Sequence, residues 1–190
     1  MSPLEIVAFV LGVANVTLVV RRSLWNYPFG LAMVVLYAWI FFEAKLYSDA
    51  ILQIFFFVVQ IYGWVNWARN AAAEGAVQVE RLDWPARGMW FAGALVAIAF
   101  WGWAMHSLTD AAYPWWDGSV AIFSVVAQIL MSRRLIENWV LWILVDLLAI
   151  GLYAAKDLQL TALLYAIFLA LATWGLIDWW LAERRTQAVA

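Results

Sequence analysis

The stretch Glu137-Asn138-Trp139-Val140-Leu141-Trp142-Ile143-Leu144-Val145-Asp146 runs on, still largely apolar, as far as Tyr153. It is long and apolar enough to cross a membrane, yet it carries an aspartate near its middle. Placing an Asp at the centre of a membrane helix costs about 2.5–3.5 kcal/mol, so a compensating interaction is expected. Asn138, Trp142 and Asp146 are spaced four residues apart and therefore share one face of a helix.

That face combines an amide, an aromatic surface and an anion. Such a set suits a flat, cationic solute, because the ring attracts a cation and the carboxylate meets its charge. We therefore predict that Asn138, Trp139, Trp142 and Asp146 bind substrate. Two alternatives stay open: Asp146 pairs with polar side chains of neighbouring helices, or the tryptophans belong to the aromatic belt at the membrane surface.

The composition of the whole chain is that of an integral membrane protein. Of its 190 residues 67% are apolar and 13% are charged, whereas about 25% are charged in soluble proteins; the mean hydropathy is +0.84. There is no cysteine and one histidine, which excludes a thiolate nucleophile and a Cys- or His-rich metal site. No P-loop sequence is present. We expect no catalytic residue, no cofactor and no nucleic-acid partner.

Seven apolar segments predict an all-α membrane protein with seven transmembrane helices. The segments are residues 4–20, 25–42, 46–67, 84–106, 118–131, 138–153 and 159–181. Asn26 and Asp83 are predicted to cap the second and fourth helices, with Pro28 and Pro85 in the respective first turns.

Charge placement predicts the orientation of the chain. The nine arginines, at positions 21, 22, 69, 81, 87, 133, 134, 184 and 185, all belong to one side of such a bundle, whereas Lys45 and Lys156 belong to the other. Basic residues collect in short cytoplasmic loops. We therefore predict a multi-pass protein of the cell inner membrane, with its N-terminus outside and its C-terminus in the cytoplasm.

The sequence also contains an internal repeat, because residues 21–67 align without gaps with residues 133–179. The alignment matches Arg21-Arg22 with Arg133-Arg134, Asn26 with Asn138, Gly63 with Gly175 and Trp67 with Trp179. A single helix separates the two triplets, so both enter the membrane in the same direction. This predicts a parallel 3+1+3 bundle with substrate at the interface of the repeats.

The predicted units are residues 1–68 (first triplet), 69–107 (cytoplasmic loop and linker helix) and 108–190 (second triplet). Asp146 aligns with Val34 and Gln53 with Tyr165. The two repeats thus differ at these polar positions, and we expect an asymmetric ligand to be recognised there.

The third segment carries a polar stripe, in which Asp49, Gln53 and Gln60 share one helical face. An amide in hydrocarbon needs a partner, and we predict that these side chains bond to substrate. The alternative is bonding between helices. Trp39, well inside the second segment, is a further candidate for stacking on a ligand.

Several motifs, taken together in their order and spacing, resemble the PnuC family of vitamin transporters. They are Trp25-Asn26-Tyr27-Pro28-Phe29-Gly30, Leu46-Tyr47-Ser48-Asp49-Ala50-Ile51-Leu52-Gln53, Tyr62-Gly63-Trp64, Glu137-Asn138-Trp139-Val140-Leu141-Trp142 with Asp146, and Thr161-Ala162-Leu163-Leu164-Tyr165. The resemblance covers about residues 10–182, nearly the whole chain.

The resemblance implies a 3+1+3 bundle related to the SWEET sugar transporters. It also implies uptake of nicotinamide riboside by facilitated diffusion, with cytoplasmic phosphorylation trapping the product. Relatives carry thiamine or riboflavin, so a thiamine or other vitamin transporter is the alternative. The expected partners are a small cationic vitamin and the lipid bilayer. We also expect a homo-oligomer, namely a trimer.

Two other classes of function fit the sequence less well. A membrane enzyme acting on a lipid-linked substrate would need a nucleophile, a metal cluster or paired acids, and we identify none. A structural or assembly subunit would need neither the polar stripe nor Asp146.

Overall fold

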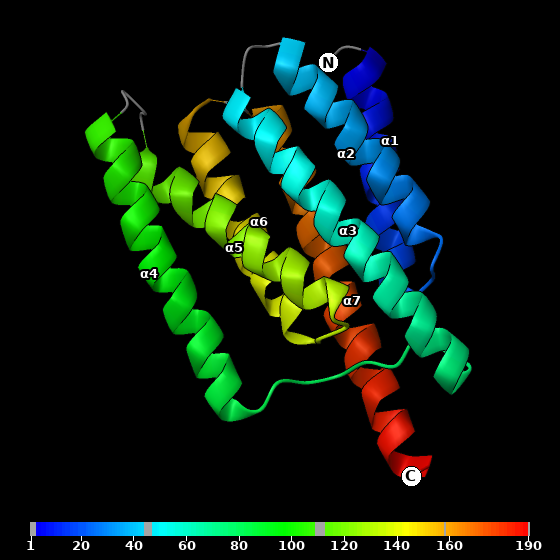
Figure 1. Cartoon of the computed structure of the whole chain (residues 1–190). Coiled ribbons are helices and arrows are strands. Elements are labelled where there is room, and N and C mark those ends of the chain that lie inside the picture. Colours follow the sequence, from blue (N-terminus) through cyan, green and yellow to red (C-terminus); the bar gives the residue numbers. More distant parts are fainter. Residues whose placement is uncertain (1–2, 44–46, 109–112, 158, 190) are drawn as a thin grey trace.

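The computed structural model describes residues 3–43, 47–108, 113–157 and 159–189. They form seven helices that run alternately up and down one bundle (Figure 1): α1 (Pro3–Val20), α2 (Asn26–Glu43), α3 (Tyr47–Glu74), α4 (Trp84–Leu108), α5 (Pro114–Ser132), α6 (Glu137–Ala155) and α7 (Gln159–Val189). Six are long and apolar enough to cross a membrane, and α1 contains the shorter apolar helix Ile6–Val20. The prediction of an all-helical membrane protein is confirmed.

The helix starts agree only in part with the predicted starts and caps. Helix α5 begins at Pro114, four residues before the predicted segment, because proline is favoured in the first turn of a helix. Asn26 is the first residue of α2, and no described N–H donates to its Oδ1, so the predicted cap is not seen; its Nδ2 donates to the Ser23 carbonyl at 2.6 Å. The Asp83 cap is confirmed, because its Oδ1 accepts from the Ala86 N–H at 2.8 Å.

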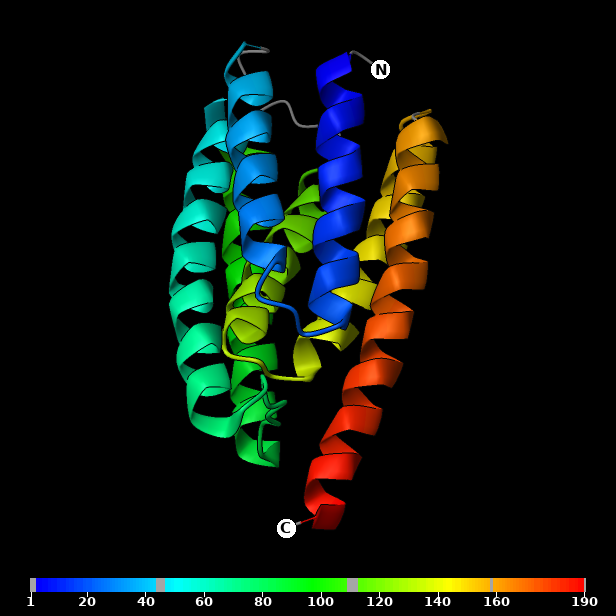
Figure 2. The ribbon, with the colours of Figure 1, turned by 90° about the vertical axis from the view of Figure 1, so that its right-hand side faces the viewer.

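The packing of the helices leaves one of them at the edge. Among the described helices, α1 packs on α2 and α7, α3 packs on α2 and α5, and α6 packs on α5 and α7. Helix α4 packs only on α5 and forms one side of the bundle in Figure 1. In Figures 1 and 2, α1 begins at the end of the bundle opposite to that at which α7 ends.

The turns that follow α1 and α5 have the same backbone geometry. Arg22 and Arg134 both adopt left-handed backbone angles, with φ of 54° and 62°. The next residue in each turn donates its N–H five residues back at 3.0 Å, from Ser23 to Leu18 and from Leu135 to Leu130. These positions correspond in the internal alignment.

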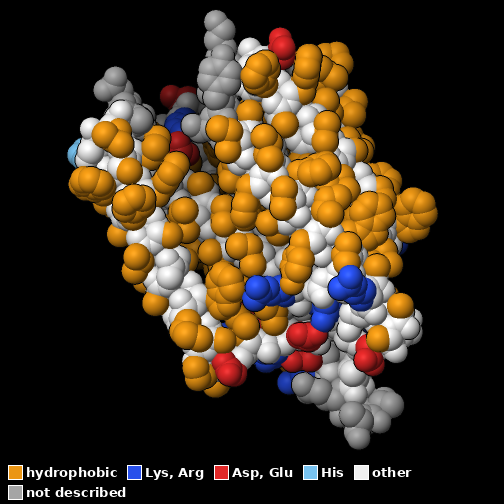
Figure 3. Space-filling view, in the orientation of Figure 1, with side chains coloured by type: hydrophobic (Ala, Val, Ile, Leu, Met, Phe, Trp, Pro, Cys, Tyr) orange, Lys and Arg blue, Asp and Glu red, His pale blue; other side chains and the backbone are white. Residues whose placement is uncertain are grey.

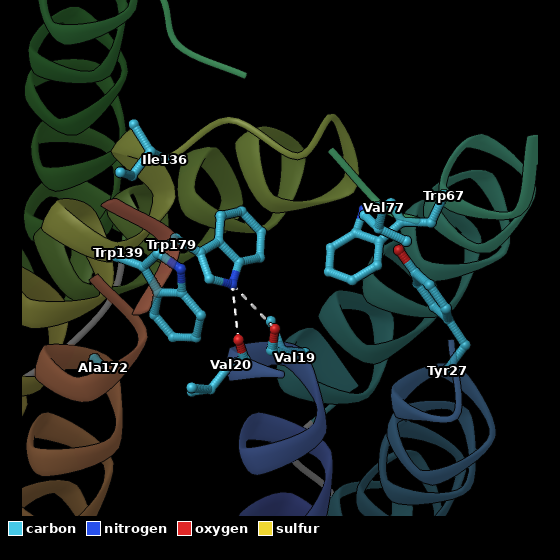
Figure 4. Close-up of a cluster of buried hydrophobic side chains, with 9 residues drawn as sticks. All are labelled: Val19, Val20, Tyr27, Trp67, Val77, Ile136, Trp139, Ala172 and Trp179. Atoms are coloured by element: carbon cyan, nitrogen blue, oxygen red, sulfur yellow. Dashed lines mark hydrogen bonds between the residues drawn. The ribbon is translucent and has the colours of Figure 1, made fainter. Parts of the chain in front are cut away.

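Two aromatic pairs correspond in the same way. The rings of Tyr27 and Trp67 lie 5.5 Å apart at 88°, and those of Trp139 and Trp179 lie 5.5 Å apart at 89°. All four side chains belong to one buried cluster between the triplets (Figure 4). These correspondences support the 3+1+3 repeat and its three units, which stay predictions.

The predicted arginine-rich side corresponds to one end of the bundle, which we call the arginine face. It comprises the ends of α1, α3, α5 and α7, the starts of α2, α4 and α6, and the nine arginines named above. Four ion pairs tie it together: Arg22–Asp178 at 2.7 Å, Arg87–Glu137 at 2.8 Å, Arg81–Glu183 and Arg134–Glu80. Three of these pairs join the α3–α4 connection or the start of α4 to the second triplet.

The connection between α3 and α4 is fixed to that face by its backbone. The Glu80 N–H donates to the Arg134 carbonyl at 3.0 Å, and the Ile136 N–H donates to the Glu80 carbonyl at 2.9 Å. Val77 of the same connection is buried in the aromatic cluster. The connection therefore covers the α5–α6 turn from the arginine face.

Candidate functional site

Asp146 is buried in the middle of α6 and 4% exposed. No other described residue forms a hydrogen bond or an ion pair with it. Its electrostatic neighbour is Tyr165 of α7. The alternative in which Asp146 is satisfied by polar groups of neighbouring helices is therefore not seen among the described residues.

Tyr165 connects Asp146 with two further tyrosines. The rings of Tyr165 and Tyr153 stack with centroids 5.3 Å apart at an interplanar angle of 17°. Tyr37 of α2 also interacts electrostatically with Tyr165. Asp146 thus interacts electrostatically with Tyr165, which stacks on Tyr153 of α6 and interacts electrostatically with Tyr37 of α2. Sequence reasoning missed Tyr37 and Tyr153, since neither belongs to a polar stripe or to a quoted motif.

A second polar group is formed by α1, α2 and α3. Gln60 is 6% exposed, and its Oε1 has no hydrogen-bond partner among the described residues. A Cβ placed on Gly30 would overlap this oxygen and would lie 2.7 Å from Asn15 Nδ2. Two amides therefore approach the backbone at Gly30, which explains the need for glycine there.

Trp142 occupies the corresponding place in the second triplet. The internal alignment matches Gly30 with Trp142 and Gln60 with Ala172. Trp142 is half-buried and packs against both hydrophobic clusters of the core, one of which contains Ala172. The Trp142 indole of the second triplet thus corresponds in position to Gly30 of the first triplet, where Gln60 approaches the backbone.

Asn138 and Trp139 lie in the core at the start of α6. Asn138 is fully buried; its Nδ2 donates to the Leu135 carbonyl at 2.7 Å, and its Oδ1 has no partner among the described residues. Trp139 is 1% exposed, and a Cβ on Gly175 would lie 2.5 Å from its indole. Trp139 is therefore a core residue and does not belong to a surface belt.

Of the remaining predicted site residues, Gln53 lies on the face of α3 that carries Gln60, whereas Trp39 does not face the site. Gln53 is half-buried and lies two helical turns from Gln60 on the same face of α3. Trp39 is 60% exposed and follows Gly30 by two and a half turns, so it points away from the buried face of α2. The structure does not bring Trp39 to the other candidates. The side chain of Asp49 lies outside the described residues.

The site thus contains buried amides, aromatic rings and one carboxylate, from both triplets. In the described part of the chain, no group of three His, Cys, Asp or Glu side chains is placed to hold a metal ion. These groups are suited to binding: stacking on a flat ring, hydrogen bonding to polar groups, and neutralisation of a positive charge.

Comparison with known proteins gives consistent matches over nearly the whole chain. The model of the nicotinamide mononucleotide transporter family matches residues 2–181. The nicotinamide riboside transporter PnuC of Escherichia coli is 29% identical, over 94% of this chain and 85% of that protein. The riboflavin/roseoflavin transporter RibM of Streptomyces davaonensis is 34% identical, over 95% of this chain and 86% of that protein.

A solved structure is also similar. The crystal structure of the vitamin B3 transporter PnuC matches with a TM-score of 0.79 and 31% identity, over 96% of this chain and 82% of that one. The predicted resemblance to PnuC is thereby confirmed. Together with the helical bundle and the buried polar site, these matches show that the chain belongs to the nicotinamide mononucleotide transporter family.

Proposed function

We propose that this protein takes up nicotinamide riboside across the cell inner membrane by facilitated diffusion. Family membership and the named PnuC relatives support this substrate. The chain contains no P-loop sequence, which favours movement down a gradient, with phosphorylation in the cytoplasm as the trapping step. The proposed orientation has the N-terminus outside, so that the arginine face lies in the cytoplasm. We also propose that the carrier assembles as a homotrimer.

The observation that carries the proposal is the buried carboxylate of Asp146. It is 4% exposed and has no hydrogen bond or ion pair with any other described residue. Ionisable groups inside membrane segments are costly and mark substrate pathways. Nicotinamide riboside carries a fixed positive charge on its pyridinium ring, so its binding would give Asp146 the opposite charge that the described protein groups do not supply.

Aromatic side chains next to Asp146 suit the flat ring of this substrate. Trp142 lies one turn before Asp146 on α6, and the Tyr153–Tyr165 stack lies beside the carboxylate. A cation held against an aromatic face gains about 2 kcal/mol when both are desolvated. We assign ring recognition to Trp142 and to these tyrosines.

Amides on both triplets suit the hydroxyl and carboxamide groups of the substrate. Gln60 Oε1 and Asn138 Oδ1 are both buried and lack partners among the described residues. A buried acceptor without a partner costs about 1–3 kcal/mol, which a ligand donor would remove. Gln53, two turns from Gln60, extends this polar face. The substrate is therefore proposed to lie between the triplets.

Riboflavin is a second candidate substrate, favoured by the 34% identity with RibM, and thiamine remains the alternative from the family resemblance. The two classes differ in charge, because riboflavin is neutral whereas nicotinamide riboside and thiamine are cationic. Asp146→Asn removes the charge and keeps the shape, so it separates a cationic substrate from a neutral one.

Proteoliposomes that contain only this protein would test the proposal. Labelled nicotinamide riboside should equilibrate down its gradient without ATP, and Asp146→Asn should weaken its binding by about tenfold, or 1.4 kcal/mol, with the melting temperature kept. If only riboflavin equilibrates, and Asp146→Asn does not change its transport, then riboflavin and not nicotinamide riboside is the substrate. A lower melting temperature with unchanged affinity would make Asp146 a structural residue.

A further inference from the structure

A groove of about 580 Å³ opens between α4 and the helices of the second triplet, next to the arginine face. It exists because α4 packs only on α5 among the described helices and stands apart from α6 and α7. Its walls are mostly apolar and include Phe91, Ala94, Val140 and Ile177, and Arg81, Arg87 and Glu137 are its charged lining residues. None of the substrate-site candidates lines this groove. Its volume lies within the range of about 300–1,000 Å³ for ligand pockets.

Two arginines are held at the edge of the groove by tryptophans that line it. The Arg184 guanidinium lies 3.8 Å from the centroid of the Trp180 ring, and that of Arg133 lies 5.9 Å from the centroid of the Trp90 ring. Neither arginine forms an ion pair with a described carboxylate. The Trp180 ring covers one flat side of the Arg184 guanidinium and leaves its N–H edge available to an acceptor. Arg133 lies at the outer limit of a cation–π contact with Trp90.

The charges around the groove do not cancel. Arg81 pairs with Glu183 and Arg87 pairs with Glu137, so these four groups are neutral together. Arg133 and Arg184 form no ion pair, and neither does Asp83, which is next to the lining residue Leu82 in the sequence, so a net positive charge remains among these described groups. On the side of the molecule drawn in Figure 3, apolar side chains cover most of the surface, and most of the charged ones gather toward the end where α4 begins and α7 ends.

We propose that the groove is a binding site for one anionic phospholipid, with an acyl chain between α4 and α6–α7 and the phosphate at Arg133 and Arg184. The apolar walls face the hydrocarbon, and the two free cations lie where the groove meets the arginine face, as an amphipathic lipid requires. Basic pockets between membrane helices on the cytoplasmic side recognise anionic headgroups in this way. Guanidinium groups pair with phosphate oxygens in bidentate geometry.

Native mass spectrometry of the purified full chain would test this proposal, with phosphatidylglycerol and phosphatidylcholine as probes at equal concentration. The unmodified protein should retain one phosphatidylglycerol in preference to phosphatidylcholine. Arg133→Gln with Arg184→Gln should weaken that retention about thirtyfold, which is about 2 kcal/mol and matches about 1 kcal/mol for each arginine near an anionic surface. Arg21→Gln with Arg69→Gln is the matched control, because both arginines are exposed on the same face and, unlike Arg133 and Arg184, neither lies over a tryptophan that lines the groove.

A second variant addresses the apolar part of the site. Val140 is 55% exposed in the groove, so Val140→Trp should fill the groove and abolish retention while both arginines stay in place. Equal retention of the two lipids, or equal loss in the control pair, would overturn the proposal. The chain has no natural cysteine, so Val140→Cys supplies a single thiol. A disulfide-linked dimer formed through it under mild oxidation would show that a second copy, and not a lipid, covers the groove.

Discussion

Trp67 and Trp179 lie against each other with ring centroids 5.7 Å apart, and each donates its indole N–H to the end of a helix in the other triplet. Trp67 donates to the Met131 carbonyl at 3.1 Å. Trp179 donates to the carbonyls of Val19 and Val20 at 3.2 and 3.1 Å (Figure 4). Helix ends leave carbonyls without partners inside the helix. The Met131 and Val19 carbonyls also accept the N–H groups of Arg134 and Arg22 at 2.9 Å, so each indole adds a donor at a helix end and joins the two triplets.

Removal of the Trp179 N–H should therefore destabilise the bundle. Trp179→Phe keeps a ring but removes the indole donor of the Val20 carbonyl, at a cost of about 1–3 kcal/mol; the Val19 carbonyl still accepts from the Arg22 N–H at 2.9 Å. Trp179→Ala should cost about 3–5 kcal/mol because it also leaves a cavity. Melting temperature in detergent is the measurement, and Trp39→Phe is the control since Trp39 is 60% exposed. Equal melting of the Trp179→Phe and Trp39→Phe variants would contradict this role.

Gly175 and Gly88 should respond to alanine with opposite signs. A Cβ on Gly175 would lie 2.5 Å from the Trp139 indole, whereas a Cβ on Gly88 of α4 would meet nothing within 4 Å. Replacing glycine by alanine in a helix gains about 0.5–1 kcal/mol where there is room. Gly88→Ala should thus keep or raise the melting temperature, and Gly175→Ala should lower it. A lowered value in both variants would show that contact with Trp139 is not the cause.

Gly30→Ala should act on the substrate site through Gln60. The new methyl group would displace the Gln60 amide, whose Oε1 it would overlap, and substrate affinity should fall by about tenfold, or 1.4 kcal/mol. Gln60→Ala should cause a similar loss, and the double variant should lose little more, because both changes remove the same contact. Additive losses, measured by binding titration, would mean that the two residues act independently.

Glu137→Gln should loosen the connection between α3 and α4. Glu137 accepts hydrogen bonds from Arg87 Nε at 2.9 Å and from the Leu82 N–H at 3.2 Å. The variant should raise the rate of limited proteolysis near Gly75 about fivefold, which corresponds to about 1 kcal/mol. Asp117→Asn is the control, since its pair with Lys156 is exposed. An unchanged cleavage rate would show that the other contacts of the connection, such as the Arg81–Glu183 pair and the backbone bonds of Glu80, hold it without Glu137.

The proposed orientation is tested with fusions after Ala190. The arginine asymmetry predicts that a reporter that is fluorescent only in the cytoplasm is active there, and that a phosphatase active only in the periplasm is not. A phosphatase signal without fluorescence would reverse the orientation.

The sequence by itself determined the helices and the side of the bundle on which the arginines lie. Hydropathy over some twenty residues is a local property, so six of the spans could be placed before the structure. Family membership was equally accessible, because the ordered motifs from Trp25 to Tyr165 occur at fixed spacing along the chain. The burial of Asp146 was predictable too, since an acid in the middle of an apolar helix has few other places to lie.

Tertiary structure alone decided which faces of these helices meet. In a membrane helix the side facing lipid is as apolar as the side facing another helix, so hydropathy gives no signal to tell them apart. For this reason the sequence did not separate Trp139, which lies in the core, from Trp39, which faces away from it. Tyr165 of α7 has electrostatic interactions with Asp146 of α6 and with Tyr37 of α2. They depend on how those helices cross, which no local pattern encodes.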